Sequence, residues 1–481
     1  MKNVEIAVTD SVEWALAHSL VFKQSNASSL HCPFTLTPSS IDKVRFEGLQ
    51  QAARLFGQLL HAISKDDDFI QHAIAPIADT DPLFSALLTL HNKLSLTQSR
   101  RATPLLIMRT DFMDDQQLGP KLIEFNGIAA GMGPFGQRAS ELHRYIAAQH
   151  ADLFQTYVEH NNSQCQPSAQ IPPEFIDNDA IEKLADGIAK SARMIKQKHK
   201  DAGKPTFVMV VQAHEDNVYD QHLLEYALHA KGIRTLRKTF TELHGQLSTG
   251  DNHRLLLNDE PIDVVYLRAG YQQCDYYDKT IIEKYCCRTL MSVRMMLEQH
   301  DIAMNATIAQ QLASSKRVQM LLSNLPAQAL MKLGLTEQEA LTIKPFFGEM
   351  LPLHADSMAH LMTTGLDNWV LKNQGEGGGH CVFGEDIVTK LRTLDEAEYE
   401  SWSLMRKIMP LPRSHPTMII RNGEASMIGD MISEIGIFTV NIDGVAIDDA
   451  VAGYLVRSKP ANVREGGVHS GQGAVDSLVY S

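Results

Sequence analysis

The segment between Lys372 and His380 constrains this chain more than any other. Four of the five residues 375–379 are glycine, and the apolar segments NWVLKNQ and HCVFG on either side are predicted strands. Glycine lets backbone N–H groups approach an anion closely, so the pattern predicts a hairpin flap over phosphate groups. It is not a P-loop, because GK[ST] is absent and no helix follows. Lys372 at the strand end supplies a point charge for a phosphate, and Glu376 is the one carboxylate at the tip.

Length and composition limit the class of protein. With 481 residues, 44% of them hydrophobic, the chain is long enough for several domains with buried cores. A formal net charge of −13 argues against a nucleic-acid partner. No apolar run reaches the roughly 18 residues of a membrane span, and the amino end lacks a signal-peptide core. Six sparse cysteines without a CxxC pair indicate a reducing compartment. We therefore expect a cytoplasmic protein that binds neither nucleic acid nor membrane.

The hydrophobic periodicity predicts an α/β chain of mixed type. The pattern favours helices over 41–64 (capped by Ser39 and Ser40), 138–150, 218–230, 279–299, 308–325 and 386–394, and strands over 104–111, 121–126, 206–212, 233–240, 264–268, 417–420 and 426–440. Residues 127–136 read as a glycine-rich loop, and the proline-containing stretch 161–179 reads as a linker. Strands alternating with a helix after residue 204 predict a βαβ unit.

Two pairs of polar residues interrupt predicted strands. Glu124 and Asn126 are two positions apart, so both side chains share one face, and such oxygen ligands suit Mg²⁺ shared with phosphates. Arg457 and Lys459 would likewise present two cations on one face. Glu434 interrupts an apolar strand and needs a hydrogen-bond partner, from the protein or from a ligand.

Together these segments resemble the eukaryotic-type glutathione synthetase family, whose members are ATP-grasp ligases. The similarity runs in order through CPFTLTPSS, MRTDFM, IEFNGIAAG, EDNVYDQ, YLRAGY, SSKRVQ, LKNQGEGGGH, ISEIGIF and RSKPANVREGGV, over nearly the whole chain. The resemblance implies a composite ATP-binding body from both chain ends, an inserted βαβ substrate domain and a glycine-rich lid. The corresponding divisions are residues 1–203, 204–305 and 306–481, with the lid at about 365–420.

The resemblance also implies a reaction and a set of site residues. Such enzymes join γ-glutamylcysteine to glycine with Mg²⁺ and ATP through an acyl phosphate, and are commonly homodimers. The residues that resemble catalytic positions are Arg109, Lys372, Glu376 and Arg457; those that resemble metal ligands are Glu124, Asn126 and Glu376. ATP contacts are implied for Glu124, Lys316, Lys372, Asn373, Gln374, Gly375, Glu376, Gly377, Gly378, Gly379, His380, Cys381, Phe383, Met405, Arg406, Lys407, Ile408, Glu434, Lys459 and Glu465. Substrate contacts are implied for Arg109, Ile128, Ala129, Ala130, Gly131, Glu215, Asp216, Asn217, Gln221, Arg268, Ala269, Gly270, Tyr271, Arg457, Val468 and His469.

Some positions depart from the family pattern and leave alternatives open. Ala129 and Gly131 stand where serines commonly line the dipeptide loop, and His469 replaces a small residue near the acceptor amine. One alternative is a sister ligase that joins a γ-glutamyl peptide to another small amine. A second is an ATP-binding regulator without catalysis. Binding alone would not require the whole set of Arg109, Glu124, Asn126, Lys372 and Glu376, which argues against this reading.

Overall fold

The computed structural model describes residues 2–151, 174–278, 288–375, 381–413, 416–464, 466–468 and 473–481. Its helices are α1 Lys2–Ala17, α2 Lys43–Ser64, α3 Asp67–Ala78, α4 Pro82–Leu96, α5 Gly133–Gln149, α7 Ala180–His199, α8 Val218–Ala230, α9 Phe240–Leu243, α10 Arg288–Glu298, α11 Ile308–Ala313, α12 Lys316–Asn324, α13 Ala327–Met331, α14 Glu337–Ile343, α15 Ser357–Thr364 and α16 Glu385–Leu391. None of the described helices has both the length and the apolar character needed to cross a membrane.

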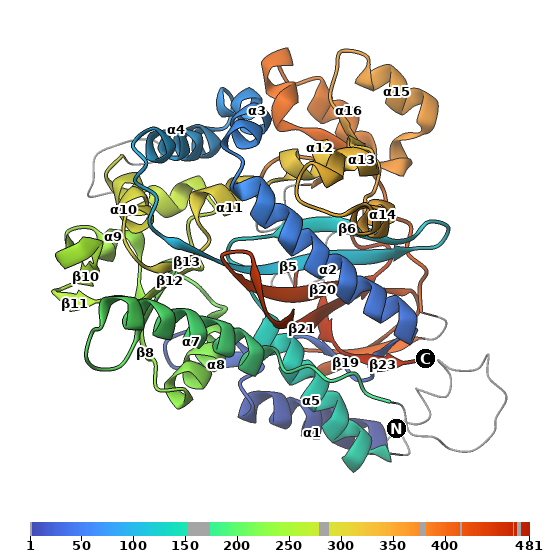
Figure 1. The fold of residues 1–481 in the computed structure, drawn as a ribbon. Coiled ribbons are helices and arrows are strands. Elements are labelled where there is room, and N and C mark those ends of the chain that lie inside the picture. The colour runs from blue at the N-terminus through green and yellow to red at the C-terminus, as the bar shows by residue number, and fades with distance from the viewer. Residues whose placement is uncertain are drawn as a thin grey trace.

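One large sheet runs through the molecule. Among the described residues it has twelve strands, with the order β19-β18-β3-β22-β21-β20-β5-β13-β12-β7-β8 and β6 paired to β5. Their bounds are β3 Phe34–Thr35, β5 Thr103–Asp115, β6 Gly119–Asn126, β7 Thr206–Val210, β8 Arg234–Lys238, β12 Val264–Leu267, β13 Ala303–Asn305, β18 Thr417–Arg421, β19 Glu424–Ile428, β20 Met431–Ile442, β21 Val445–Pro460 and β22 Ala474–Asp476. Strands from both chain ends therefore lie side by side in one sheet (Figure 1).

The part of the sheet from β13 to β8 is the predicted βαβ unit. Strands β13, β12, β7 and β8 are all parallel, and α8 connects β7 to β8. Strand β13 also pairs in parallel with β5, so this unit continues the central sheet. Parallel strands joined by a helix carry their loops toward one edge, and Gln212, Asn217 and Arg268 follow the carboxyl ends of β7 and β12.

A smaller antiparallel sheet covers the central one. It has the order β14-β17-β15-β16, formed by β14 Met350–Pro352, β15 Trp369–Lys372, β16 Cys381–Phe383 and β17 Ser403–Arg406. The pairing of β15 with β16 confirms the predicted flanking strands of the glycine-rich segment. Residues 376–380 of that segment lie outside the described residues. Short strands elsewhere are β1 Val21–Lys23, β2 Ser29–His31, β4 Ser39–Ile41, β9 Leu247–Thr249, β10 Leu255–Leu257, β11 Glu260–Pro261 and β23 Leu478–Tyr480.

The alternation of side chains along β5 determines which residues face each apolar core and which face the site. Leu106, Met108 and Phe112 point to the face that α2 covers, where they join the larger apolar core. Leu105 and Ile107 point to the opposite face, in the core with α5 and α7. Figure 1 shows α2 lying across the sheet, with α5 and α1 below it. Because side chains alternate, Arg109 and Asp111 continue the line of Leu105 and Ile107.

Several predicted boundaries were wrong for local reasons. Helix α2 is capped by Asp42, which accepts from the Arg45 N–H, while Ser39 and Ser40 belong to β4. The predicted helix over 308–325 is two helices, because the Ser315 side chain caps α12. The predicted strand over 426–440 is split between β19 and β20, and α5 begins at Gly133 inside the predicted loop.

Candidate active site

A cavity of about 1180 Å³ opens between the central sheet and the small antiparallel sheet. Strands β5, β6, β20 and β21 supply its floor, β15 to β17 supply one wall, and the loops after β7 and β12 close its far end. The cavity has the size of a cofactor or substrate site, and many of its lining side chains are charged.

Asp111 lies on β5 behind the residues that line the cavity and is 1% exposed. Its carboxylate accepts two hydrogen bonds from Arg109, of 2.6 Å from Nε and 2.7 Å from one terminal nitrogen. The Asn126 amide nitrogen and an Arg457 terminal nitrogen each donate to Asp111 Oδ2 at 3.0 Å. One buried carboxylate thus fixes three side chains from β5, β6 and β21. A Cβ atom at Gly436, on the neighbouring strand, would lie 2.6 Å from Asp111 Oδ1, so the group also requires glycine there.

Glu434 finds the partner that its place in an apolar strand requires. It lies opposite Arg457 in the β20–β21 register and accepts a hydrogen bond from that guanidinium. Burial lowers the pKa of Arg457, and the nearby Arg109 lowers it further. The paired carboxylates Asp111 and Glu434 keep this cation in place at the cavity wall.

Glu124 is a carboxylate surrounded by cations. Burial raises its pKa, but the positive charges of Lys316, Lys372, Arg457 and Arg109 outweigh this effect and lower the pKa to about 2. The nearest ammonium is that of Lys316, 3.6 Å from Oε2. Glu124 is therefore ionised at neutral pH and available to a cation.

A β-bulge at Ile123 turns the backbone carbonyl of this residue toward the site. In the β5–β6 register Asp111 faces Glu124 and Phe112 faces Leu122, which leaves Ile123 without a partner position. Its carbonyl accepts from Lys372 Nζ at 3.1 Å. Lys316 Nζ donates to the Gly375 carbonyl at 2.9 Å. The two lysines thus converge beside Glu124, below the stem of the glycine-rich segment.

The far end of the cavity holds unsatisfied polar atoms. Glu215 Oε2, Asn217 Oδ1 and Arg268 Nε are buried and find no hydrogen-bond partner among the described residues. Burial lowers the pKa of Arg268, but Glu215 together with Tyr266, Asp220 and Tyr271 outweighs this effect and raises that pKa above its usual range. The two acceptors suit the α-ammonium group of an amino acid, and the guanidinium suits its α-carboxylate. Such a ligand would give these buried polar atoms the partners that they lack. We call this part of the cavity the amino-acid end.

Asp275 organises the adjoining loop. One of its oxygens accepts from the backbone N–H groups of Gly270, Tyr271 and Gln272 at 2.8, 3.2 and 3.1 Å. Its other oxygen accepts from Gln212 at 2.8 Å. This arrangement holds the Tyr271 ring against the cavity. Burial, and then the charge of Asp275, raise the pKa of Tyr271 to about 12, so its hydroxyl stays protonated.

The structure brings most of the predicted site residues to this one cavity. Its lining includes Arg109, Glu124, Asn126, Ile128, Ala129, Gly131, Glu215, Asp216, Asn217, Arg268, Tyr271, Lys316, Lys372, Gly375, Cys381, Phe383, Met405, Arg406, Lys407, Ile408, Glu434, Arg457, Lys459 and Val468. Six predicted residues are not among the lining: Ala130, Gln221, Ala269, Gly270, Asn373 and Gln374. Predictions for Glu376, Gly377, Gly378, Gly379, His380, Glu465 and His469 lie outside the described residues.

Several of the predicted residues that do not line the cavity make hydrogen bonds within the protein. Ala130 gives its carbonyl to the Tyr266 hydroxyl at 3.1 Å, and Gln221 accepts from Arg237. The Asn373 side chain accepts from the Gly375 N–H at 2.9 Å, and that of Gln374 accepts from the Arg317 N–H at 3.0 Å. Gln374 faces an adjoining cavity of about 660 Å³, which shares Asn126, Ile128, Tyr271 and Gly375 with the active-site cavity.

Sequence reasoning missed Asp111, Asp275 and many of the residues that line the cavity. Asp111 stands two positions after Arg109 in MRTDFM, so the alternation that paired Glu124 with Asn126 could have found it. Asp275 carries no comparable signal. The further lining residues are Met113, Gln116, Ile123, Met132, Gln212, Asp367, Trp369, Val370, Gly384, Met409, Pro410, Pro412, Ile432, Ala461, Asn462, Val463, Arg464, Gly466 and Gly467.

Comparison with known proteins gives one consistent answer. The family model described as eukaryotic glutathione synthase, ATP binding domain, matches residues 2–480. The chain is 27% identical to a chloroplastic glutathione synthetase of Solanum lycopersicum, over 99% of this chain and 84% of that one. It is 26% identical to the glutathione synthetase of Homo sapiens, over 99% and 97%. The solved structure of a glutathione synthetase-like effector from Globodera pallida superposes with a TM-score of 0.71 at 19% identity, covering 99% of this chain and 97% of that one.

Proposed function

Because the chain belongs to the eukaryotic glutathione synthase family and shares its ATP-grasp type of fold, we propose that it is a glutathione synthetase, an ATP-dependent carbon–nitrogen ligase. In the proposed reaction it joins γ-glutamylcysteine to glycine and releases ADP and phosphate. The observation that carries the proposal is the single cavity that holds a cation-rich phosphate end and, opposite it, an unsatisfied amino-acid end.

ATP is the co-substrate of this family, and the described residues suit its binding. Lys316 and Lys372 supply positive charge beside the stem of the glycine-rich segment, where the phosphates would lie. We assign the adenine contact to residues 405–408, which line the same cavity as Glu434 and Lys459. Glu376 and the glycines after it complete the phosphate contacts in this proposal.

The donor set near Glu124 fits Mg²⁺. Glu124 is ionised, and the Asn126 nitrogen is engaged by Asp111, which leaves the Asn126 oxygen for a cation. The described residues contain no cluster of three His, Cys, Asp or Glu side chains that could hold a metal ion. In this proposal the remaining ligands of the ion are Glu376 and phosphate oxygens. When bound, Mg²⁺ would neutralise charge on the transferred phosphoryl group.

The dipeptide lies, in this proposal, between the amino-acid end and the arginine pair. Its α-ammonium contacts Glu215 and Asn217, its α-carboxylate contacts Arg268, and its cysteinyl carboxylate faces Arg109 and Arg457. An oxygen of that carboxylate attacks the γ-phosphorus of ATP, the bond to the β,γ-bridging oxygen breaks, and ADP leaves. The glycine nitrogen then attacks the acyl carbon, loses a proton, and expels phosphate. The arginines stabilise the charge in both steps, and the covered cavity protects the acyl phosphate from water.

The acceptor position is proposed at Val468, which is 2% exposed and lines the cavity next to Gly467. His469 follows it and lies outside the described residues. The relatives favour glycine over another amine, and they favour catalysis over an ATP-binding regulator. We further propose a homodimer and a cytoplasmic location.

Isotope transfer tests the acyl-phosphate route. Purified protein is incubated with MgATP, glycine and γ-glutamylcysteine that carries ¹⁸O in its cysteinyl carboxylate, and the inorganic phosphate is analysed by mass. The proposal expects one labelled oxygen in each phosphate released, because the carboxylate oxygen stays with phosphorus. Peptide formation with unlabelled phosphate would contradict the mechanism.

A further inference from the structure

A second cavity lies at the opposite edge of the parallel strands from the active site. Its volume is about 510 Å³, and its wall includes Thr206 at the start of β7 and Arg234 at the start of β8. The active-site residues Gln212 and Arg268 follow the other ends of β7 and β12. Each strand is four to five residues long, so at about 3.3 Å per residue the two cavities are separated by roughly 15 Å of sheet.

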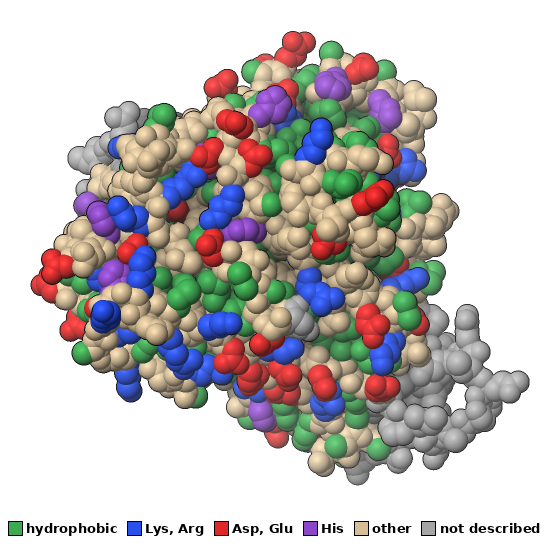
Figure 2. Space-filling model, in the orientation of Figure 1, with side chains coloured by type: hydrophobic (Ala, Val, Ile, Leu, Met, Phe, Trp, Pro, Cys, Tyr) green, Lys and Arg blue, Asp and Glu red, His purple; other side chains and the backbone are tan. Residues whose placement is uncertain are grey.

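Basic side chains line this second cavity. Lys196 comes from the last turn of α7, Lys204 from the following loop, His229 from the last turn of α8, and Arg234 from β8. We call the cavity formed by these four residues and Thr206 the basic pocket. Figure 2 shows Lys and Arg side chains gathered at the lower left, over α7 and the neighbouring strand β8 of Figure 1. This concentration contrasts with the formal net charge of −13 of the chain.

Lys196 is the most informative member of the basic pocket. The stem of this side chain is buried, since the residue is only 9% exposed, while its ammonium reaches solvent and makes no ion pair or hydrogen bond among the described residues. The charge of Lys196 acts to lower the pKa of Asp263, but that carboxylate is occupied by other donors: one oxygen accepts from Arg254 at 2.5 Å and the other from the Thr206 N–H at 2.7 Å. An ammonium that reaches the solvent of the pocket without a direct ion pair is available to an anion.

The one carboxylate in the wall is weakly engaged. Glu260 Oε2 lies 3.4 Å from an Arg234 terminal nitrogen, and the two side chains are 65% and 49% exposed. Exposed ion pairs of this kind contribute little stability, so Arg234 can turn toward a ligand at small cost. Lys204 is exposed, and Gly203 before it has open space at its Cβ position, which leaves the mouth of the pocket unobstructed.

We propose that the basic pocket binds a small phosphate-bearing organic molecule, separately from the ATP site. The three cations Lys196, Lys204 and Arg234 match the charge of a phosphoryl group. The volume of the pocket exceeds that of free phosphate and falls in the range of small-molecule sites. A polyanion such as nucleic acid does not fit, because it would need an extended basic face on an otherwise acidic chain. The proposal stands independently of the ligase activity.

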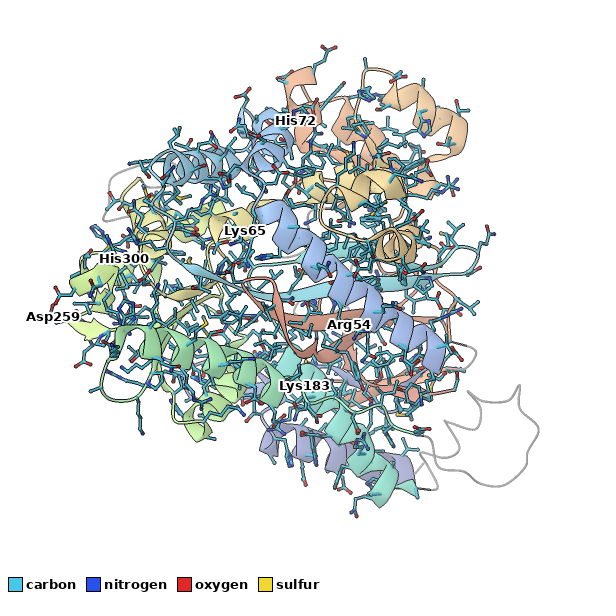
Figure 3. The ribbon with its side chains drawn as sticks, in the orientation of Figure 1. Arg54, Lys65, His72, Lys183, Asp259 and His300 are labelled. Atoms are coloured by element: carbon cyan, nitrogen blue, oxygen red, sulfur yellow. The ribbon has the colours of Figure 1, made fainter. Side chains whose placement is uncertain are left out.

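The test measures binding of pyrophosphate by isothermal titration calorimetry. The full-length protein is first saturated with a non-hydrolysable ATP analogue and Mg²⁺, so that the active site is blocked. Two variants remove the basic pocket: the exposed pair Lys204→Ala/Arg234→Ala, and Lys196→Met, which keeps the length of the side chain. The matched control is Lys183→Ala/Lys190→Ala, also on α7; Figure 3 labels Lys183, which is 13 residues, or about 20 Å of helix, from Lys196.

The proposal expects saturable binding of one pyrophosphate per chain, weakened at least about 10-fold in both pocket variants and unchanged in the control. Three results would overturn it: no saturable binding, equal weakening in the control, or binding that disappears when the ATP analogue is present. The ligase assay distinguishes this outcome from a failure of the proposed function, because the pocket variants leave every residue of the active site in place.

Discussion

The Arg109 guanidinium and the Asp111 carboxylate form a two-point ion pair along one face of β5, with hydrogen bonds of 2.6 and 2.7 Å. Positions two apart on a strand share a face, so this pair is set by local geometry. Its effect is not local, since the same carboxylate also holds Asn126 of β6 and Arg457 of β21. The proposed metal ligand and both proposed charge-stabilising arginines are thereby fixed relative to one another.

Asp111→Asn tests this relationship. The substitution keeps the shape of the side chain but removes the charge and one acceptor. Glu434 still pairs with Arg457, but the repulsion between Arg109 and Arg457 is no longer offset by the carboxylate between them, and the Asn126 amide can turn. We expect kcat/KM for γ-glutamylcysteine to fall about 100-fold, with a higher Mg²⁺ requirement and an unchanged circular dichroism spectrum. The control is Asp114→Asn on the same strand, where the carboxylate is 42% exposed and pairs with Arg45. Equal kinetics for the two variants would remove Asp111 from the positioning role.

Arg109→Ala removes a guanidinium that faces the reacting carboxylate in the proposed mechanism. Because charge on that group grows in the transition state, we expect kcat to fall by at least about 100-fold while the KM for ATP changes less than about 3-fold. Steady-state kinetics with each substrate varied in turn gives the answer. An effect confined to the KM for ATP would assign Arg109 to the nucleotide instead.

Lys372→Met removes the ammonium that bonds the Ile123 carbonyl and lowers the pKa of Glu124. We expect the dissociation constant of MgATP to rise at least about 10-fold, because a point charge on the phosphates is lost. Calorimetric titration of wild type, this variant and Lys332→Met, an exposed lysine at the end of α13, makes the comparison. Unchanged affinity in Lys372→Met would refute the phosphate contact.

His91 makes folding stability depend on pH. Burial lowers its pKa to about 4, and the charge of Arg100 adds to this, with Asp67 opposing. The unfolded chain takes up a proton near pH 6.5 and the folded chain does not, so stability is lost as pH falls from 6.5 toward 4. Between pH 7.5 and 5 the loss attributable to His91 is about 2 kcal/mol. Denaturant unfolding should show a smaller loss in His91→Gln than in wild type, and no such reduction in the control His72→Gln, an exposed residue labelled in Figure 3.

Patterns within one strand or helix were the predictable part of the molecule. The alternation that put Glu124 and Asn126 on one face also put both at the cavity, and the helix over 218–230 matches α8. What the periodicity could not give were relationships set by pairing between distant strands. Arg457 meets Asp111 across 346 positions, and the bulge that turns the Ile123 carbonyl toward Lys372 depends on how β6 pairs with β5.

Caps and bends that depend on single side chains were also missed. Ser315 divides residues 308–325 into two helices by capping α12, which places Lys316 at a helix start beside Gly375. The pattern of apolar residues continues across this break, so hydrophobic spacing alone predicted one helix. The ordered family motifs supplied what periodicity did not, because they named residues from both chain ends that the sheet brings together.

The most direct test of the central claim is turnover with both substrates present. Purified protein is incubated with MgATP and γ-glutamylcysteine, with and without glycine and then with other small amines, while ADP release and product mass are followed. The account predicts glycine-dependent ADP release, one ADP for each product molecule with the mass of glutathione. Turnover with another amine but not with glycine, or tight ATP binding without any turnover, would contradict it.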